Sequence, residues 1–479
     1  MTEKATNRVQ KWVGLGKYVA ITAVLLHVFV FFATWNNGHD WGGDFSLYIA
    51  QAQAILDGNT QELEQINRDC MLRSERRIGP DLYPIGFPLL LVPMVFFFGK
   101  SIMAFKLLNL LFFLGTLYLI PKVLNFWGHK SWSYWMVGYL ALMPYFMHFE
   151  HEIIADLAAW FFTILSLFFF LKAREKQHSW SAFFSGLSIA YALLIKSLSI
   201  TLLGAMAMTL FIDIVFLKQR VQLRTGVYLL AACILVLLPA KLLYPDGNSS
   251  YLEQLVELTP AWLWNNLHYN VALPSSLLMD RDLLYYPFAL LFVVGLWTSI
   301  RKSAFSLPLW FLLFHLILLT IWPYHEGPRF ILIMVPVLIL LCFEGLKTIG
   351  NLKPTAPIIY SSVFMLVLSG TLAQELYKRK DPAMRPGQAI ANDKDAEDLW
   401  AYIQENTSPT DTFIFFKPRV LRLFTDRIGY LATKREHAEP LNPDYYIELT
   451  QYGGFSDSTF KKVYSNYRFI LYEFPRENQ

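Results

Sequence analysis

The chain has 479 residues, of which 55% are hydrophobic and only 16% are charged, and its mean hydropathy is +0.36. This composition excludes an ordinary soluble protein and predicts an integral membrane protein with many spans. The net charge is only +4, so the position of the charges is more informative than their sum. Cys233 and Cys342 lie in apolar runs and Cys70 stands alone in a loop, so neither a disulfide framework nor a CxxC metal site is expected.

The N-terminus carries basic residues ahead of an apolar run, as both signal peptides and signal anchors do. The basic residues are Lys4, Arg8, Lys11 and Lys17. The apolar run continues through Phe32 without a small-residue cleavage pattern after it. This favours an uncleaved first span that acts as a signal anchor.

Apolar runs long enough to cross about 30 Å of hydrocarbon recur along the chain and predict about eleven membrane helices. They lie at about 17–35, 102–121, 132–148, 153–172, 181–198, 200–217, 226–244, 285–300, 306–322, 329–347 and 356–375. The segment 83–99 is shorter and is interrupted by prolines. We expect it to form a helix along the outer interface, as we do for Phe45 to Leu56.

The charge pattern predicts the orientation of these helices. With a cytoplasmic N-terminus, every connection left inside is basic, as the positive-inside rule requires. The basic residues concerned are Lys122, Lys130, Lys172, Arg174, Lys176, Lys218, Arg220, Arg224, Arg301, Lys302, Lys347 and Lys353. The loops 36–101 and 245–284, the short turns near Glu150, Lys196 and His325, and the C-terminus would then lie outside.

The composition changes to that of a soluble domain near Lys378. Asp395 to Asn406 has helical spacing, whereas Thr412 to Phe416 and Phe469 to Phe474 have the character of strands. We therefore expect a membrane domain at 1–377 and a small α/β domain at 378–479 on the outer face.

Carboxylates gather at the predicted outer edge of the bundle from places far apart in sequence. Asp44 follows the first span, and Glu150, His151, Glu152 and Asp156 mark the second outer turn. Glu152 and Asp156 share one helical face at a spacing of i, i+4. A carboxylate that enters the hydrocarbon is costly unless it has a partner or a task. For Asp44, Glu150, His151 and Glu152, an ordinary solvated loop position without a catalytic or binding role remains an alternative.

Cations stand at the same predicted edge. Lys196 ends the fifth span and Arg329 opens the tenth. Terminal cations usually snorkel to the interface, so each alone has an ordinary explanation. Two cations beside several carboxylates predict a site for a phosphate and a hydroxyl-bearing acceptor.

Several short segments follow one another in an order found in a known family. They are Asp44 with Tyr48, Tyr83 to Leu89, Glu152 to Asp156, Leu194 to Ser197, Glu326 to Phe330 ahead of Val335-Pro336, and Phe415 to Arg419 in the tail. In this order they resemble the GT-C glycosyltransferases, most closely the bacterial group similar to protein O-mannosyltransferases and to the lipid A aminoarabinose transferase. The resemblance implies a multi-spanning α-helical fold with a small outer domain in a bacterial inner membrane.

The resemblance also implies roles for single residues. Asp44 matches the acidic residue of the first outer loop that acts in catalysis in this family. Lys196 and Arg329 match the cations that face the lipid phosphate. We expect His325 and Glu326 beside that phosphate, and an acceptor or sugar at a second group of residues. This second group is Asp156, Glu152, His151, Glu150 and Tyr83. The chain has Gly42-Gly43-Asp44 where many relatives place two adjacent acids, so the partner of Asp44 is left open.

The expected reaction is an inverting transfer of a sugar from a polyprenyl-phosphate-linked donor to a glycan, glycolipid or protein acceptor, with Asp44 as general base. Nothing in the sequence demands a metal. A divalent ion (Mg, Mn or Zn), if used, would be held by Asp44, Glu152 and Asp156. The expected partners include membrane lipids and no nucleic acid.

Two other functions remain open at this stage. One is a secondary transporter, which would be expected to carry charges near the bilayer midplane. Asp213 and Glu344 instead lie near the inner ends of their spans. The other is a non-enzymatic flipping or assembly partner in envelope polysaccharide export, for which Asp44 and Asp156 would be replaceable.

Overall fold

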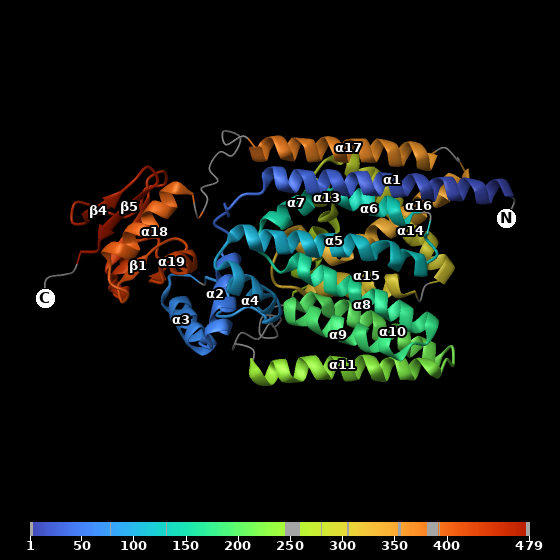
Figure 1. Ribbon diagram of the computed structural model, residues 1–479, viewed down its shortest axis with the longest axis horizontal. Coiled ribbons are helices and arrows are strands. Elements are labelled where there is room, and N and C mark those ends of the chain that lie inside the picture. Colours follow the sequence, from blue (N-terminus) through green and yellow to red (C-terminus); the bar gives the residue numbers. More distant parts are fainter. Residues whose placement is uncertain are drawn as a thin grey trace.

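Long helices lie side by side in a bundle, and a small α/β domain sits at one end of it (Figure 1). The computed structural model describes residues 3–76, 78–130, 132–244, 259–278, 280–303, 306–352, 356–380, 391 and 393–475. The first helix begins at the end remote from the domain. We call the two ends of the bundle the domain end and the N-terminal end.

The bundle consists of the helices α1 (Glu3–Thr34), α5 (Ile102–Phe126), α6 (Ser133–Leu142), α7 (Pro144–His151), α8 (Asp156–Lys176), α9 (Ser179–Ile195), α10 (Ile200–Val215), α11 (Val221–Leu243), α14 (Asp282–Ser303), α15 (Leu307–Ile321), α16 (Val335–Leu352) and α17 (Ala356–Lys380). Within the described ranges, seven helical segments are long and apolar enough to span a membrane, and four more apolar helices are shorter. The prediction of a multi-spanning α-helical membrane protein is confirmed.

Two of the predicted spans differ in detail from the helices found. The run 132–148 is broken between α6 and α7 at Met143, whose backbone is extended and precedes Pro144. The run 329–347 begins with two short 3₁₀ turns, η3 (Gly327–Phe330) and η4 (Leu332–Met334), before α16. Both irregular segments lie next to residues of the predicted site.

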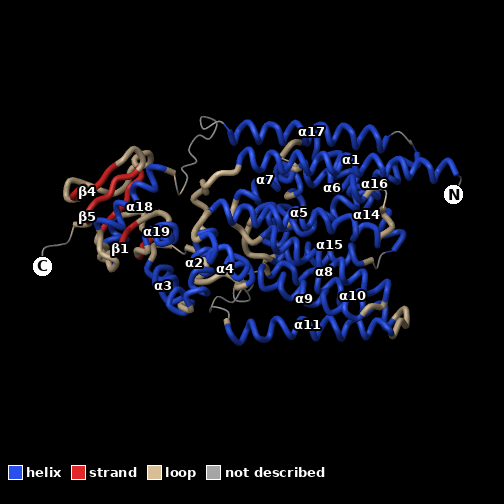
Figure 2. The backbone as a smooth tube through the Cα atoms, viewed as in Figure 1, coloured by secondary structure: helices blue, strands red, loops and turns tan. Residues whose placement is uncertain are grey.

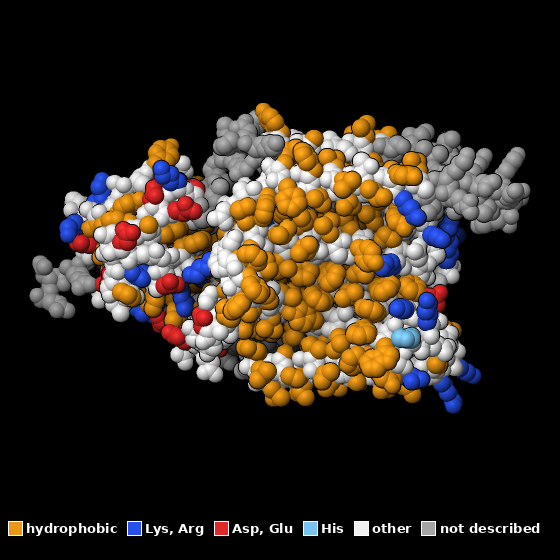
Figure 3. All heavy atoms as spheres, viewed as in Figure 1, with side chains coloured by type: hydrophobic (Ala, Val, Ile, Leu, Met, Phe, Trp, Pro, Cys, Tyr) orange, Lys and Arg blue, Asp and Glu red, His pale blue; other side chains and the backbone are white. Residues whose placement is uncertain are grey.

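The surface of the bundle is apolar in its middle and charged at its ends. Figure 3 shows hydrophobic side chains over the bundle, Lys and Arg gathered at the N-terminal end, and mixed charges on the domain. On α11, Leu230, Leu235 and Leu242 are 59%, 59% and 74% exposed. An apolar surface of this kind is what lipid contact requires.

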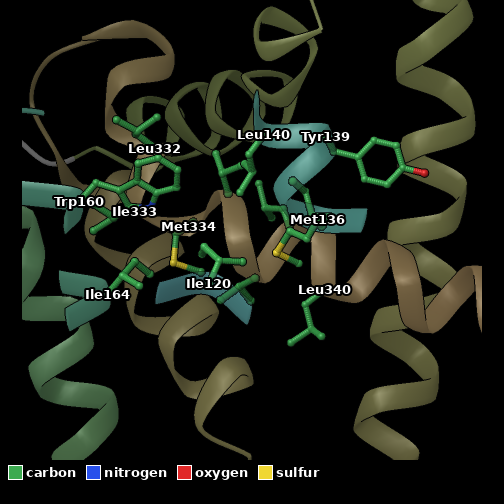
Figure 4. Packing of buried hydrophobic residues seen from close by; sticks show 14 of the residues in the cluster. Ile120, Met136, Tyr139, Leu140, Trp160, Ile164, Leu332, Ile333, Met334 and Leu340 are labelled. Carbon is green, nitrogen blue, oxygen red and sulfur yellow. The ribbon is translucent and has the colours of Figure 1, made fainter. Parts of the chain in front are cut away.

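The bundle core is packed by large side chains from helices that are distant in sequence. In Figure 4, Trp160 and Ile164 of α8 lie with Met136 and Leu140 of α6 and with Leu332 of η4. Helices α14 and α16 approach so closely that a Cβ on Gly295 would lie 1.7 Å from the carbonyl oxygen of Leu341. Small residues at such contacts let membrane helices pack backbone to backbone.

Three helices of the loop 36–101 cover the domain end: α2 (Asp44–Asp57), α3 (Thr60–Arg73) and α4 (Gly86–Phe98). The predicted helices at Phe45 to Leu56 and within 83–99 are therefore confirmed as helices. A Cβ on Gly86 would lie 2.6 Å from the carbonyl carbon of Leu194, so the start of α4 rests on the end of α9. The loop 245–284 contributes α12 (Pro260–Ala272) and α13 (Pro274–Leu277), while 245–258 lies outside the described residues.

The domain is built on a five-stranded mixed sheet (Figure 2). Its elements are α18 (Lys394–Asn406), β1 (Thr412–Ile414), α19 (Pro418–Thr425), β2 (Ile428–Tyr430), α20 (Arg435–Ala438), η6 (Glu439–Leu441), β3 (Tyr445–Leu449), β4 (Lys461–Ser465) and β5 (Phe469–Glu473). The strand order is β2-β1-β3-β5-β4, with β1 parallel to β2 and β3, and β5 antiparallel to β3 and β4. The predicted helix near 395–406 and the strands near 412 and 469 are confirmed. Residues 381–390 and 392, just beyond the expected domain boundary, lie outside the described residues.

The domain is held against the loop 36–101 by polar contacts. Arg73 donates from Nη1 to the hydroxyl of Tyr430 at 2.7 Å, and Lys100 donates to the carbonyl of Leu423 at 2.6 Å. Arg419 also donates to the carbonyl of Pro80. These contacts bring α19 close to the N-terminus of α2, where Asp44 lies.

Candidate functional site

Arg329 connects two carboxylates that are far apart in the sequence. Its Nη1 donates to Asp44 Oδ2 at 3.2 Å and its Nη2 donates to Asp156 Oδ2 at 3.1 Å, across 285 and 173 residues. The other oxygen of Asp156 accepts from Lys196 Nζ at 2.5 Å. The structure thus brings four predicted site residues into one network at the domain end, which we call the central cluster.

Each member of the central cluster stands where a regular element begins or ends. Asp44 and Asp156 are the first residues of α2 and α8, where the positive end of the helix dipole favours a carboxylate. Lys196 caps the C-terminus of α9, where a cation is favoured. Arg329 lies in η3 after Gly327, whose φ of +70° belongs to the left-handed region that glycine adopts without strain.

Tyr83 is the second partner of Asp44. Its hydroxyl donates to Asp44 Oδ1 at 2.6 Å, and its ring stacks on Tyr48 with centroids 4.5 Å apart. Gln51 holds the backbone of Tyr83 by accepting from its N–H and donating to its carbonyl, both at 2.9 Å. Because Asp44, Tyr48 and Gln51 all belong to α2, one helix carries the carboxylate and also fixes its hydrogen-bond donor.

Neighbouring charges fix the protonation states of Arg329 and Tyr83. Asp156, and after it Asp44, raise the pKa of Arg329 above its ordinary value, so its positive charge is permanent. Burial, and after it the charge of Asp44, raise the pKa of Tyr83 well above its ordinary value, which keeps the phenol protonated as a donor. Glu326 adds a carboxylate 3.7 Å from Arg329 Nη1.

One donor of the central cluster is unused. The Nε of Arg329 is buried and has no hydrogen-bond partner among the described residues. A buried N–H without a partner costs about 1–3 kcal/mol. Asp44 is nevertheless 32% and Arg329 24% exposed at the side chain, so the cluster faces an accessible region. An incoming anion can therefore reach the guanidinium.

The remaining predicted site residues are placed apart from these contacts. Glu150 is fully buried and accepts from His27 Nε2 on α1 at 2.9 Å, so it offers no surface to a substrate. His151 is 8% exposed and bonds Thr34 at 3.0 Å. These two residues tie α7 to α1 within the bundle.

Glu152 and His325 also have partners of their own. Glu152 pairs with His148 at 2.9 Å and is 22% exposed at the side chain. His325 bonds Asn266 Oδ1 at 2.7 Å and stacks on Tyr269 at 3.9 Å, so the turn before Arg329 is docked on α12. Of the two, His325 is the more exposed, whereas Glu152 is half-buried at the C-terminal end of α7.

The carboxylates do not assemble as metal ligands. Among the residues that the structure describes, no group of three or more His, Cys, Asp or Glu side chains is arranged to hold an ion. Asp44 and Asp156 are instead bridged by Arg329, and Glu152 is engaged by His148. The set Asp44, Glu152 and Asp156 therefore does not fit a divalent ion in this arrangement, because a guanidinium stands between two of its members.

The sequence analysis assigned no role at the site to three residues around Asp44, namely Tyr48, Gln51 and Arg419. Tyr48 was noted only as part of a motif, although the spacing of Asp44, Tyr48 and Gln51 puts the three on one helical face and was a usable signal. Arg419 was likewise noted only within the tail segment Phe415 to Arg419, and its place near Asp44 had no signal in the sequence, because it comes from the domain and approaches the site only through tertiary contacts.

Comparison with known proteins gives a structural answer only. No protein-family model and no curated protein matches the sequence. ArnT from Cupriavidus metallidurans, solved with undecaprenyl phosphate bound, matches 94% of this chain and 97% of its own at a TM-score of 0.58 and 13% identity. An oligosaccharyltransferase from Archaeoglobus fulgidus in its apo form matches 91% of this chain and 69% of its own at a TM-score of 0.59 and 12% identity.

A further solved structure is AglB from Archaeoglobus fulgidus in complex with an inhibitory peptide and a dolichol-phosphate. It covers 90% of this chain and 69% of its own at a TM-score of 0.56 and 12% identity. ArnT is a lipid A aminoarabinose transferase, and both ArnT and AglB are GT-C membrane glycosyltransferases. The similarity extends over most of the chain, bundle and domain alike. The fold of this chain is the GT-C fold of the membrane glycosyltransferases.

Proposed function

We propose that this protein is an inverting glycosyltransferase that moves a sugar from a polyprenyl-phosphate-linked donor to an acceptor at the domain end of the bundle. The observation that carries the proposal is the central cluster, in which an accessible carboxylate, Asp44, is oriented by two donors beside a guanidinium with an unused N–H. The polyprenyl phosphates bound to ArnT and AglB support the choice of donor.

Asp44 acts as the general base in this proposal. The acceptor hydroxyl or amine transfers its proton to a carboxylate oxygen of Asp44 while its oxygen or nitrogen bonds to the anomeric carbon of the sugar. The bond from that carbon to the phosphate oxygen breaks, and its electron pair leaves with the polyprenyl phosphate. Attack from the face opposite the phosphate inverts the anomeric configuration. A positioned base typically contributes 10²–10⁴-fold to the rate.

Arg329 and Lys196 receive the phosphate in this proposal. The Arg329 side chain is 24% exposed and the Lys196 side chain 15%, and both cations are held beside Asp156, so their positive charge lies next to the accessible region at Asp44. Charge that grows on the departing phosphate is stabilised by fixed cations in a site of low dielectric constant. Asp156 keeps the two cations together between turnovers.

The proposed site faces the periplasm of a bacterial inner membrane. The support is the asymmetry of charge, because the basic connections lie at the N-terminal end, as expected for the cytoplasmic side. A donor lipid in the outer leaflet would then present its phosphate at the level of the cluster.

The test is release of polyprenyl phosphate from polyprenyl-phosphate sugars by the purified protein when glycan, glycolipid or protein acceptors are supplied. Asp44→Asn should abolish release, whereas Asp57→Asn, at the exposed end of the same helix, should leave it unchanged. Thermal unfolding should be similar for both variants. Near-normal turnover by Asp44→Asn would refute the assignment. Absence of release by the wild-type protein with every donor would favour a transporter or an assembly partner.

A further inference from the structure

A groove opens beside Asp44 between the domain and the segment that follows α3. Its volume is about 320 Å³, and its lining includes Gly43, directly before Asp44 in the chain. The charged side chains that line it are all cations, namely Arg76, Lys417 and Arg419. The volume is at the lower end of the range of small-ligand sites.

These cations are not engaged in ion pairs among the residues that the structure describes, in contrast to Arg329 and Lys196 in the central cluster. Arg419 donates to the carbonyl of Pro80, but its Nε is buried without a hydrogen-bond partner among the described residues. Burial lowers the pKa of Arg419, and the nearby charges of Tyr83 and Asp44 oppose this effect without cancelling it.

The groove is close to the proposed reaction centre. Arg419 lies against Gly79, whose added Cβ would stand 2.9 Å from Nη1, and Tyr83 and Asp44 are near enough for their charges to act on the pKa of Arg419. A Cβ on Gly43 would meet nothing within 4 Å, so the space beside the N-terminus of α2 is open. A molecule seated in the groove can therefore extend toward Asp44.

A neighbouring cavity, which is lined partly by α2, lacks this charge bias. It is also lined by Arg419, together with Lys100 and Arg422, but Asp57, Glu62 and Asp426 balance them. A cavity lined by equal numbers of acidic and basic side chains does not favour an anionic ligand over a cationic one. The groove at Gly43 is thus the place where an anion is favoured.

We propose that the groove binds the phosphate or carboxylate group of the acceptor, so that the substrate class is an anionic glycan or glycolipid whose nucleophile reaches Asp44. This inference rests on the proposed function for the role of Asp44, but anion binding by the groove stands apart from catalysis. Guanidinium groups bind both oxyanions in a bidentate manner, and Lys417 adds a point charge. The domain then serves to select acceptors, because Lys417 and Arg419 belong to it.

The test measures binding rather than turnover. The full-length protein in phosphatidylcholine nanodiscs is titrated with three dye-labelled probes: maltose 1-phosphate, trigalacturonate and neutral maltotriose. We expect at least one anionic probe to bind and the neutral probe not to bind. The anionic probe that binds identifies phosphate or carboxylate as the recognised group. Arg76→Glu combined with Lys417→Glu should weaken that binding by roughly tenfold or more, since each reversal removes an attraction and adds a repulsion.

Lys462→Glu is the matched control, because it reverses an exposed charge on β4, at the other edge of the sheet from β2, and should leave binding unchanged. If the double reversal does not fold, Arg76→Gln with Lys417→Gln replaces it with a smaller expected loss. Equal binding of neutral and anionic probes, or full binding by the double variant, would overturn the proposal. Binding of the anionic probe in phosphatidylcholine nanodiscs but not in phosphatidylglycerol nanodiscs would also overturn the proposal, because it would assign the groove to bilayer headgroups.

Asp44→Asn separates this inference from the proposed function. It should keep the binding of the anionic probe while sugar transfer is lost. Probe binding without any transferase activity in the wild-type protein would refute the proposed reaction and leave the anion site in place. Transferase activity without selective probe binding would refute the anion site alone.

Discussion

Arg329 and Asp44 are joined by a hydrogen bond of 3.2 Å between Nη1 and Oδ2, so a residue expected to face the lipid phosphate also orients the proposed base. The same guanidinium holds Asp156 through Nη2. A donor phosphate that engages Arg329 therefore acts on the group that holds Asp44. The donor and acceptor halves of the site are thus coupled through one side chain.

Arg329→Lys should separate these roles. A lysine carries the same charge but cannot bond Asp44 and Asp156 with a planar fork, so one carboxylate loses its partner. We expect kcat to fall by about 10²–10³-fold, as for loss of one positioned donor. Initial rates of polyprenyl phosphate release give the measurement, with Arg281→Lys at an exposed helix start as the control. An unchanged kcat would show that charge alone suffices.

Tyr83→Phe removes the hydroxyl that donates to Asp44 but keeps the ring on Tyr48 and the backbone bonds to Gln51. A hydrogen bond to a charged group is worth about 1.5–3 kcal/mol, which corresponds to roughly 10–100-fold in rate. We expect kcat to fall in this range while the melting temperature stays within a few degrees. If the melting temperature falls and kcat does not, Tyr83 is a structural residue only.

Gln51→Leu tests whether the support of Tyr83 matters. Gln51 is 1% exposed and makes both backbone bonds to Tyr83. Leucine fills similar space but makes neither bond, so the ring of Tyr83 loses its position against Asp44. We expect kcat to fall with little change in the KM for the donor, and Gln51→Glu, which can still accept from the Tyr83 N–H, to recover part of the loss. Equal rates for both variants and the wild-type protein would show that Gln51 does not position Tyr83 for catalysis.

The sequence allowed the bundle, the outer helices and the acidic and basic members of the central cluster to be predicted, because each depends on local patterns. Apolar run lengths identify helices, and an aspartate or a lysine at a helix end is visible in the chain itself. The burial of Glu150 against His27 could not be predicted, since it depends on how α7 packs on α1. The approach of Arg419 to Asp44 likewise depends on where the domain docks.

Cys70 gives a prediction for pH. Burial raises the pKa of its thiol to about 11, from an ordinary value near 9. A raised pKa of an acid means that the folded state favours the neutral thiol, so stability is unaffected below pH 9 and declines as pH rises from about 9 to 11. In a Cys233→Ala, Cys342→Ala background, alkylation of Cys70 at pH 8 should be slow and should accelerate steeply above pH 10. Alkylation at the rate of an exposed thiol at pH 8 would contradict the burial of α3 against the domain.

Gly295→Ala tests the packing of α14 on α16. The added methyl would lie 1.7 Å from the carbonyl oxygen of Leu341, far inside van der Waals contact, so the two helices must move apart. Overpacking of this kind costs about 1–3 kcal/mol or more, and here the obstacle is backbone rather than a flexible side chain. Gly370→Ala is the matched control, because its Cβ would meet nothing within 4 Å and alanine favours a helix by about 1 kcal/mol over glycine. Thermal unfolding in detergent should show a lowered melting temperature for Gly295→Ala and an equal or raised one for Gly370→Ala, and the reverse order would contradict the contact between α14 and α16.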